Sequence, residues 1–126
     1  MLDAIESHID DKYNMICAFD LVNEEDYNVG IDYFLEQILT TKKRCGDKFQ
    51  VLFHAGESYS RTNKELYDAI VMGSKRIGHG FALAKHPKLI ELVKQKNICI
   101  ESCPISNNVL GYVKDLRCHP VRGLIA

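Results

Sequence analysis

His54 and Glu57 are the residues of this chain whose types and spacing most directly suggest chemistry. They stand in Phe53-His54-Ala55-Gly56-Glu57, directly after a short apolar run, Phe49 to Phe53. Histidine is a common ligand of transition metals, and a carboxylate beside a metal-activated water can transfer protons. A lone His54 is more simply explained as a core histidine, so the rest of the chain must decide between the two.

A second histidine and an acidic loop follow other apolar stretches. His79 lies in Arg76-Ile77-Gly78-His79-Gly80, where two glycines permit close backbone approach and unusual dihedral angles. Asn23-Glu24-Glu25-Asp26 follows the apolar run Met15–Val22, which contains the single acid Asp20. Each segment also has a plain structural explanation. The His79 segment can be a turn that happens to contain a histidine, and the acidic segment can be a solvated turn before a helix. The functional interpretation is that the acidic loop faces a substrate and that His79 belongs to a metal or acid–base site.

The elements that must position these residues alternate between strand-like and helix-like patterns. Strands are predicted at 15–22, 49–53, around Ile77 and at 97–101. Helices are predicted at Leu2–Ile9, at 31–44 before Gly46, from a Thr62/Glu65 capping box to Gly73, from Pro87 onward, and as short pieces at 109–116 and 119–125. This alternation predicts an α/β fold with a parallel sheet. Right-handed crossovers would bring all four strand ends, and hence His54, Glu57 and His79, to one side.

The composition excludes several classes of protein. With 126 residues, 46% hydrophobic and 26% charged, the chain is expected to form one globular domain. A net charge of −1 gives no strong attraction to nucleic acid or to an anionic membrane. The sequence contains no apolar run long enough to span a bilayer and no visible signal peptide. Five cysteines at irregular spacing predict buried or semi-buried free thiols, not a disulfide framework.

Three motifs in order resemble the adenosine deaminase family: His54-Ala55-Gly56-Glu57, then Arg76-Ile77-Gly78-His79-Gly80-Phe81-Ala82-Leu83, then Glu101-Ser102-Cys103-Pro104-Ile105-Ser106-Asn107. Lys85-His86-Pro87, Leu116-Arg117 and His119-Pro120 are similar to its adenosine deaminase-related growth factor (adenosine deaminase 2-like) branch. The resemblance covers nearly the whole chain. It implies part of a (β/α)8 TIM barrel of the metallo-dependent hydrolase type, with residues 1–126 forming about four βα units, the fourth to the seventh, of a single catalytic domain cut at both ends.

The resemblance also implies an activity and a set of residue roles. Members of the family use zinc to hydrolyse adenosine and 2'-deoxyadenosine to inosine products and ammonia. By likeness, His54 corresponds to a Zn²⁺ ligand, Glu57 to the acid that protonates purine N1, and His79 to the histidine beside the activated water. Asn23 and Glu25 correspond to a substrate-binding loop. The expected partner is a small purine nucleoside, with no nucleic acid and no membrane. The branch implies an extracellular, secreted parent protein that forms a homodimer.

The chain also departs from the family pattern. No His-x-His occurs in it, and no Asp-Asp pair follows its last strand, so most zinc ligands are expected outside it. Asn23 stands where the family usually has glycine, which bears on substrate choice. The isolated chain is therefore expected to be inactive. Two alternatives stay open: a deaminase of AMP or another adenine compound, and a non-catalytic, growth-factor-like or binding module that keeps the fold.

Overall fold

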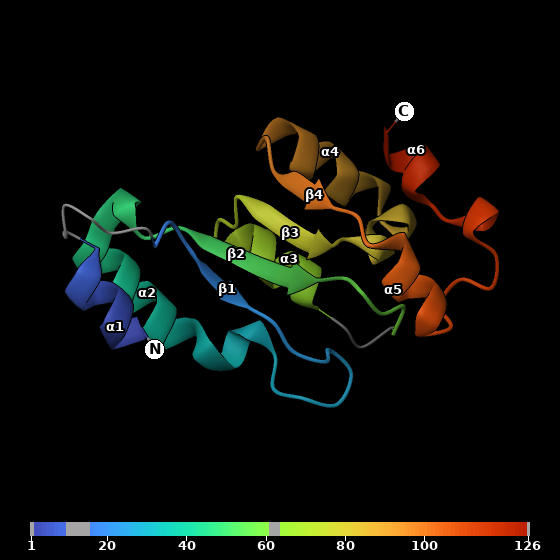
Figure 1. The fold of residues 1–126 in the computed structure, drawn as a ribbon. Coiled ribbons are helices and arrows are strands. Elements are labelled where there is room, and N and C mark those ends of the chain that lie inside the picture. The colour runs from blue at the N-terminus through green and yellow to red at the C-terminus, as the bar shows by residue number, and fades with distance from the viewer. Residues whose placement is uncertain (1, 10–15, 61–63, 126) are drawn as a thin grey trace.

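Four parallel strands and their connecting helices make up the fold. A computed structural model describes residues 2–9, 16–60 and 64–125 (Figure 1). The strands are β1 Phe19–Leu21, β2 Val51–Ala55, β3 Arg76–His79 and β4 Cys99–Glu101. The helices are α1 Leu2–His8, α2 Leu35–Cys45, α3 Glu65–Val71, α4 Pro87–Gln95, α5 Pro104–Val109 and α6 Val121–Ile125. Short 3₁₀ turns lie at Ile31–Phe34, Gly46–Lys48, Phe81–Lys85 and Leu116–Cys118.

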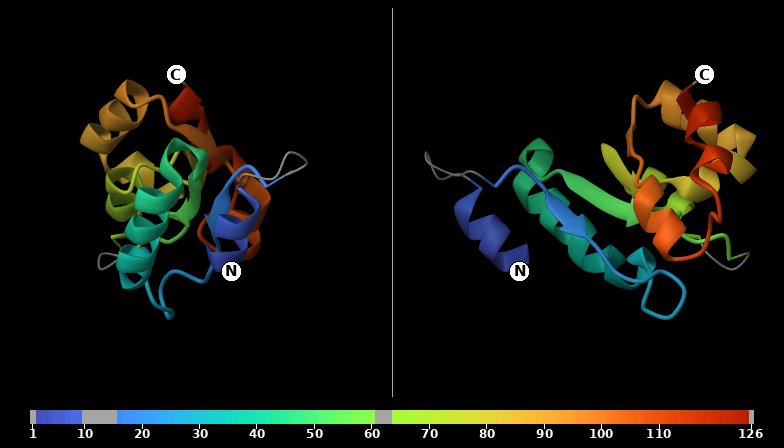
Figure 2. Two further views of the ribbon diagram at one scale, coloured as in Figure 1. Left: turned by 90° about the vertical axis from the view of Figure 1, so that its left-hand side faces the viewer. Right: turned by 45° about the vertical axis from the view of Figure 1, so that its right-hand side comes forward.

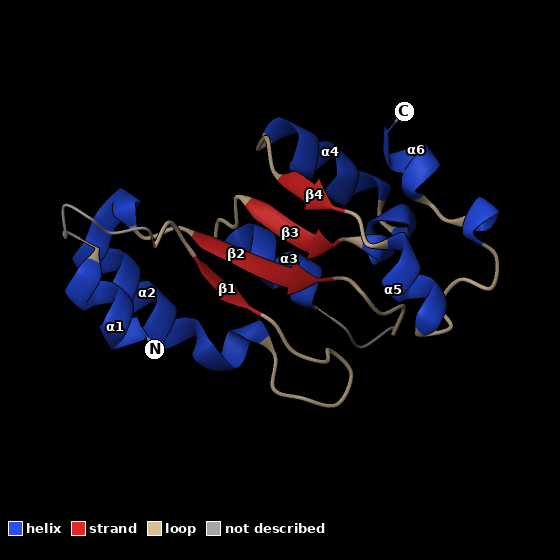
Figure 3. Cartoon of the chain, viewed as in Figure 1, coloured by secondary structure: helices blue, strands red, loops and turns tan. Residues whose placement is uncertain are grey.

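The sheet has the sequential order β1-β2-β3-β4, with every neighbouring pair parallel. A helix follows each of the first three strands, and α2, α3 and α4 lie along one face of the sheet (Figure 3). This is the α/β partial barrel that the sequence predicts. All four strands end on the same side, so the loops that follow them gather there (Figure 1).

The core fills the space between the sheet and these helices, because side chains alternate between the two faces of a strand. In β2, Val51, Phe53 and Ala55 are buried toward the helices, whereas Leu52 and His54 are half-buried on the opposite face. We call that opposite face the open face of the sheet. Beyond β1, α1 packs beside α2, as two further views show (Figure 2).

Several predicted boundaries are wrong. The strand predicted at 15–22 begins only at Phe19, although residues 10–15 lie outside the described residues. β2 ends at Ala55 and not at Phe53, so His54 lies inside the strand. No helix covers 109–116, since α5 ends at Val109 and a turn follows. For the two strands the apolar pattern locates the element, but hydrogen bonding with its neighbours determines its length.

Two predicted details of the helices also differ. In the predicted capping box, Thr62 lies outside the described residues, and Glu65 is the first residue of α3, where its carboxylate accepts from the Ile31 N–H at 3.0 Å. Of the apolar stripe of α2, Ile38 is buried but Leu39 is half exposed. Helical spacing identifies a face, whereas the neighbouring layer determines how much of it is covered.

All five cysteines are free thiols, as predicted, but the expectation that they are buried is wrong for Cys17, Cys99 and Cys118, which are exposed. Among the described residues, no helix has the length and apolar character needed to cross a membrane.

Candidate active site

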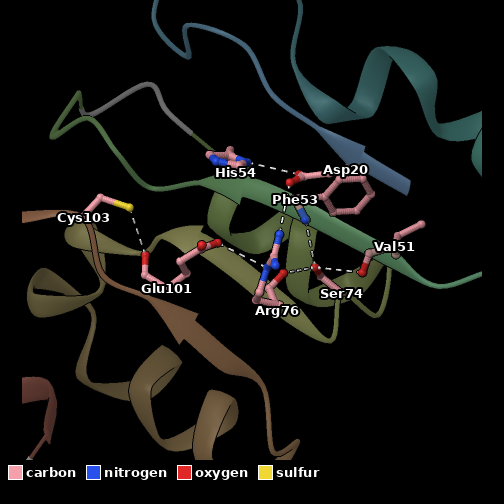
Figure 4. Close-up of polar contacts among 8 residues, drawn as sticks. All are labelled: Asp20, Val51, Phe53, His54, Ser74, Arg76, Glu101 and Cys103. Carbon is pink, nitrogen blue, oxygen red and sulfur yellow. Dashed lines mark hydrogen bonds and ion pairs between the residues drawn. The ribbon is translucent and has the colours of Figure 1, made fainter. Parts of the chain in front are cut away.

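His54 lies near the carboxyl end of β2 on the open face, and a carboxylate from the next strand orients its ring. Its Nδ1 is 3.1 Å from Oδ1 of Asp20 in β1 (Figure 4). An Nδ1–H donated to this carboxylate leaves the lone pair on Nε2, and this tautomer is assigned from the geometry. This carboxylate–histidine arrangement is the one that holds metal-ligating imidazoles in proteins.

Gly78 makes room for that ring. Gly78 is the register partner of His54 on β3, and a Cβ placed there would lie 2.8 Å from Cδ2 and 3.0 Å from Nε2 of His54. The imidazole therefore lies almost directly on the Gly78 backbone. The sequence predicted close backbone approach around this glycine, and the structure shows that the group approaching it is the His54 ring.

Arg76 extends the polar network on the open face toward the fourth strand. Its Nη2 lies 3.2 Å from Oδ2 of Asp20, and its Nε lies 3.3 Å from Oε2 of Glu101 (Figure 4). Charged groups from β1, β3 and β4 thus meet beside His54. In a parallel sheet these contacts depend on register, because Asp20 and Arg76 are two strands apart with Leu52 between them.

His79 lies beside His54 because its backbone departs from the strand conformation. Its φ is +67°, a left-handed value that is rare for a residue with a side chain. Its ring lies edge-on to the ring of His54 with 5.4 Å between centroids, and its Nδ1 is 3.2 Å from Oε1 of Glu57. That contact lacks hydrogen-bond alignment, and Nδ1 is buried without a hydrogen-bond partner in the described chain. Backbone strain of this kind is frequent at active sites.

Glu57 lies two residues after β2, and a side chain from α5 contacts its carboxylate. The Ser106 hydroxyl donates to its Oε1 at 3.2 Å, and Ser106 belongs to α5. The next residue on this helix, Asn107, is fully buried, with its Oδ1 2.9 Å from Nε2 of His119. Nδ1 of His119 accepts from the Val121 N–H at 3.1 Å, so the ring is neutral, and burial lowers its pKa. His119 thus ties the C-terminal part of the chain to α5, the helix whose Ser106 contacts Glu57.

The acidic loop after β1 is attached to the loop after β2. Glu25 accepts from the Ser58 N–H at 3.0 Å, and the Ser58 hydroxyl donates to Asp26 at 2.6 Å. Asn23 is exposed and accepts from the Glu24 N–H at 2.9 Å. Burial, and then the nearby carboxylates, raise the pKa of the Tyr112 phenol, which keeps that hydroxyl protonated.

A zinc ion is compatible with His54 but needs further ligands. Because Nδ1 of His54 is held by Asp20, Nε2 keeps its lone pair, which a zinc-binding imidazole requires. Among the described residues, no group of three or more His, Cys, Asp or Glu side chains is placed to hold a metal ion. The described residues therefore do not make a complete zinc site, because zinc sites in proteins take about four ligands.

The structure brings together His54, Glu57 and His79 as the sequence predicts, and it places Glu25 one loop away. No recorded contact joins Asn23 to this group. Sequence reasoning assigned no role to Arg76 and Ser106. A lone acid, Asp20, in an otherwise apolar strand was the available signal for the network on the open face.

Comparisons with known proteins show which family this chain resembles. The family model described as adenosine deaminase matches residues 4–126. The chain is 49% identical over 107 residues to an adenosine deaminase 2 from Dictyostelium discoideum, covering 82% of this chain and 20% of that protein. It is 43% identical over 115 residues to an adenosine deaminase 2 from Sus scrofa, covering 89% of this chain and 22% of that protein. It is 43% identical over 110 residues to an adenosine deaminase from Aedes albopictus, covering 85% of this chain and 20% of that protein. The chain spans about a fifth of the length of these curated relatives.

Proposed function

The chain belongs to the adenosine deaminase family, and from that premise we propose that its parent protein hydrolyses adenosine and 2'-deoxyadenosine to inosine products and ammonia. Residues 1–126 then form one partial catalytic domain. The observation that supports this proposal best is the approach of His79 to both Glu57 and the His54 ring, at the ends of adjacent parallel strands. Active sites of barrels with this architecture occupy that end of the sheet.

In this proposal His54 is a zinc ligand that binds through Nε2, because Asp20 occupies Nδ1. We place the other ligands in parts of the domain beyond this chain. When bound, zinc supplies a water whose pKa is lowered toward neutrality. The part that this chain adds is the orientation of one imidazole, fixed by Asp20 on one side and by Gly78 beneath the ring.

Glu57 is proposed as the acid that gives its proton to N1 of the purine. Among the described residues, the Ser106 hydroxyl donates to Oε1 of Glu57, and Nδ1 of His79 lies 3.2 Å from the same oxygen. In this proposal Oε2 is the oxygen that faces N1. Protonating N1 reduces the aromatic stabilisation that water must overcome when it attacks C6. His79, buried beside both Glu57 and His54, is placed to orient the attacking water or stabilise the charge that develops there.

The acidic loop supports a nucleoside over a nucleotide as substrate. Glu24, Glu25 and Asp26 lie in the loop after β1. Burial first, and then the charges of these three acids and of Glu57, raise the pKa of the Tyr112 phenol. A phosphate brought to this loop would meet like charge, whereas ribose hydroxyls could donate hydrogen bonds to it. We assign Glu25 to substrate binding on this basis, and Asn23 from the family resemblance of the same loop. Deamination of AMP is the rival outcome in the assay below.

The decisive experiment uses full-length protein loaded with zinc, assayed for inosine release from adenosine. We expect Glu57→Gln to lower kcat by roughly 10²-fold or more, as loss of a proton donor does, and His79→Ala to lower it by a similar factor through loss of charge stabilisation. His54→Ala should reduce zinc content. Unchanged turnover in Glu57→Gln would refute its role as acid. Greater turnover of AMP than of adenosine would favour the rival substrate class, and a full-length protein that lacks both zinc and turnover would favour the non-catalytic module.

The chain of 126 residues on its own should release no inosine in that assay, because no three of its described His, Cys, Asp or Glu side chains are placed together to hold a metal ion. From the same resemblance we propose that the parent protein is extracellular and homodimeric. Sedimentation of full-length protein recovered from culture medium tests both points, since a retained or monomeric protein would contradict them.

A further inference from the structure

The Arg76 side chain joins acids that lie on both sides of it across the open face of the sheet. It starts on β3, reaches past β2 to Asp20 on β1, and also lies against Glu101 on β4 (Figure 4). Exposed ion pairs contribute little stability on average. The side chains of Arg76 and Asp20 are 37% and 30% exposed, so this network is not explained by stability alone.

The consequence of the network is geometric. Oδ1 of Asp20 faces Nδ1 of His54, and Oδ2 of the same carboxylate faces Nη2 of Arg76. A carboxylate held at both oxygens has little freedom to rotate, since a rotation that improves one contact breaks the other. Arg76 also offsets the repulsion that Asp20 and Glu101 would otherwise exert on each other.

We propose that Arg76 is a positioning residue for His54: by fixing the Asp20 carboxylate, it keeps the imidazole in the orientation and tautomer whose Nε2 can bind a divalent transition metal. The inference rests on the proposed role of His54 as a zinc ligand. Arg76 acts through Asp20 and touches neither metal nor substrate. If Asp20 turns away, the tautomer with its proton on Nε2 competes, and that form cannot bind a metal through Nε2.

The planar guanidinium matters as well as its charge. Nη2 of Arg76 donates to Asp20, and Nε lies 3.3 Å from the Glu101 carboxylate without hydrogen-bond alignment. A lysine ammonium has one nitrogen and cannot place two nitrogens beside two different carboxylates. Arg76→Lys should therefore restore part of the effect lost in Arg76→Met. A role in charge balance alone would make lysine equivalent to arginine.

The test measures the zinc affinity of full-length apo-protein by competition with a chromophoric chelator. We expect Arg76→Met to weaken affinity about tenfold, at the low end of the range for outer-shell partners, and Arg76→Lys to fall between Met and wild type. The matched control is Arg117→Met, because Arg117 makes an ion pair with Asp115 that is exposed at the surface. The control should bind zinc as wild type does. Visible spectra of the Co²⁺-loaded proteins report ligand geometry independently of activity.

A double-mutant cycle separates positioning through Asp20 from other effects. In an Asp20→Asn background, Arg76→Met should weaken zinc binding less than twofold, because the carboxylate it acts through is gone. Additive losses, or a lower melting temperature with unchanged zinc affinity, would overturn the proposal. His54→Ala distinguishes the two levels of inference: if it leaves zinc affinity unchanged, the proposed ligand role fails. If only the Arg76 variants bind normally, the positioning role alone fails.

Discussion

Gly78→Ala tests whether the His54 ring lies where the structure places it. The φ of Gly78 is not in the left-handed region, so alanine fits the backbone and the added methyl group acts only on its neighbours. That methyl carbon would lie 2.8 Å from Cδ2 and 2.9 Å from Cγ of His54. Carbon atoms pack at roughly 3.5 Å or more, so the ring must move by about 0.7 Å or the strands must separate.

Two losses follow from that displacement. Overpacking of a fitted site costs about 1–3 kcal/mol of unfolding free energy. The shifted ring also loses its alignment with Asp20, so zinc affinity should fall by about tenfold or more. Urea denaturation and chelator competition on full-length protein measure the two losses separately. Gly123→Ala is the control, because Gly123 lies in α6 with no atom within 4 Å of the added Cβ.

The cause is isolated by repeating Gly78→Ala in a His54→Ala background. Without the imidazole the methyl group has room, so its cost to stability should fall to under about 0.5 kcal/mol. An equal cost in both backgrounds would show that the methyl group collides with something other than His54. No cost in either background would show that the ring does not lie on Gly78.

Two further predictions concern the supports around Glu57. Burial lowers the pKa of His119, so folding favours its neutral ring. The resulting contribution to stability is complete above the ordinary pKa of about 6.5 and is lost as the pH falls below it. In denaturant titrations, the unfolding free energy of His119→Gln should therefore fall less between about pH 7 and about pH 5 than that of the wild type. Ser106→Ala removes the donor to Oε1 of Glu57 and should lower kcat/KM about 2- to 10-fold in steady-state assays, with Ser106→Thr restoring part of it; an unchanged kcat/KM in Ser106→Ala would refute the contact.

The elements and their order could be predicted from the sequence because they depend on local patterns. Apolar runs and helical spacing locate β2, α2 and α4, and alternation of these elements implies a parallel sheet whose strand ends coincide. This is sufficient to bring His54, Glu57 and His79 to one side. Strand ends were less predictable, because the last residue of a strand is determined by hydrogen bonds to its neighbours and not by apolarity.

The supports of the site depend on geometry that no local pattern encodes. The Asp20–Arg76 contact joins strands two apart in the sheet, and a shift of register by one residue would turn one partner to the other face. Strict alternation would turn His79 toward the helices, on the same side as its register partner Ala55; its φ of +67° brings the ring beside His54 instead. A histidine between two glycines suggests an unusual backbone but not its direction.

These supports divide into two groups that reach different residues. Asp20, Arg76 and Gly78 act on the orientation of His54 from β1 and β3. Ser106 acts on Glu57 from α5. If zinc binding and proton donation are divided between His54 and Glu57, changes on the open face should lower zinc affinity, whereas a change in α5 should lower turnover at saturating zinc. A Ser106→Ala protein with weakened zinc affinity and normal turnover would contradict this division of roles.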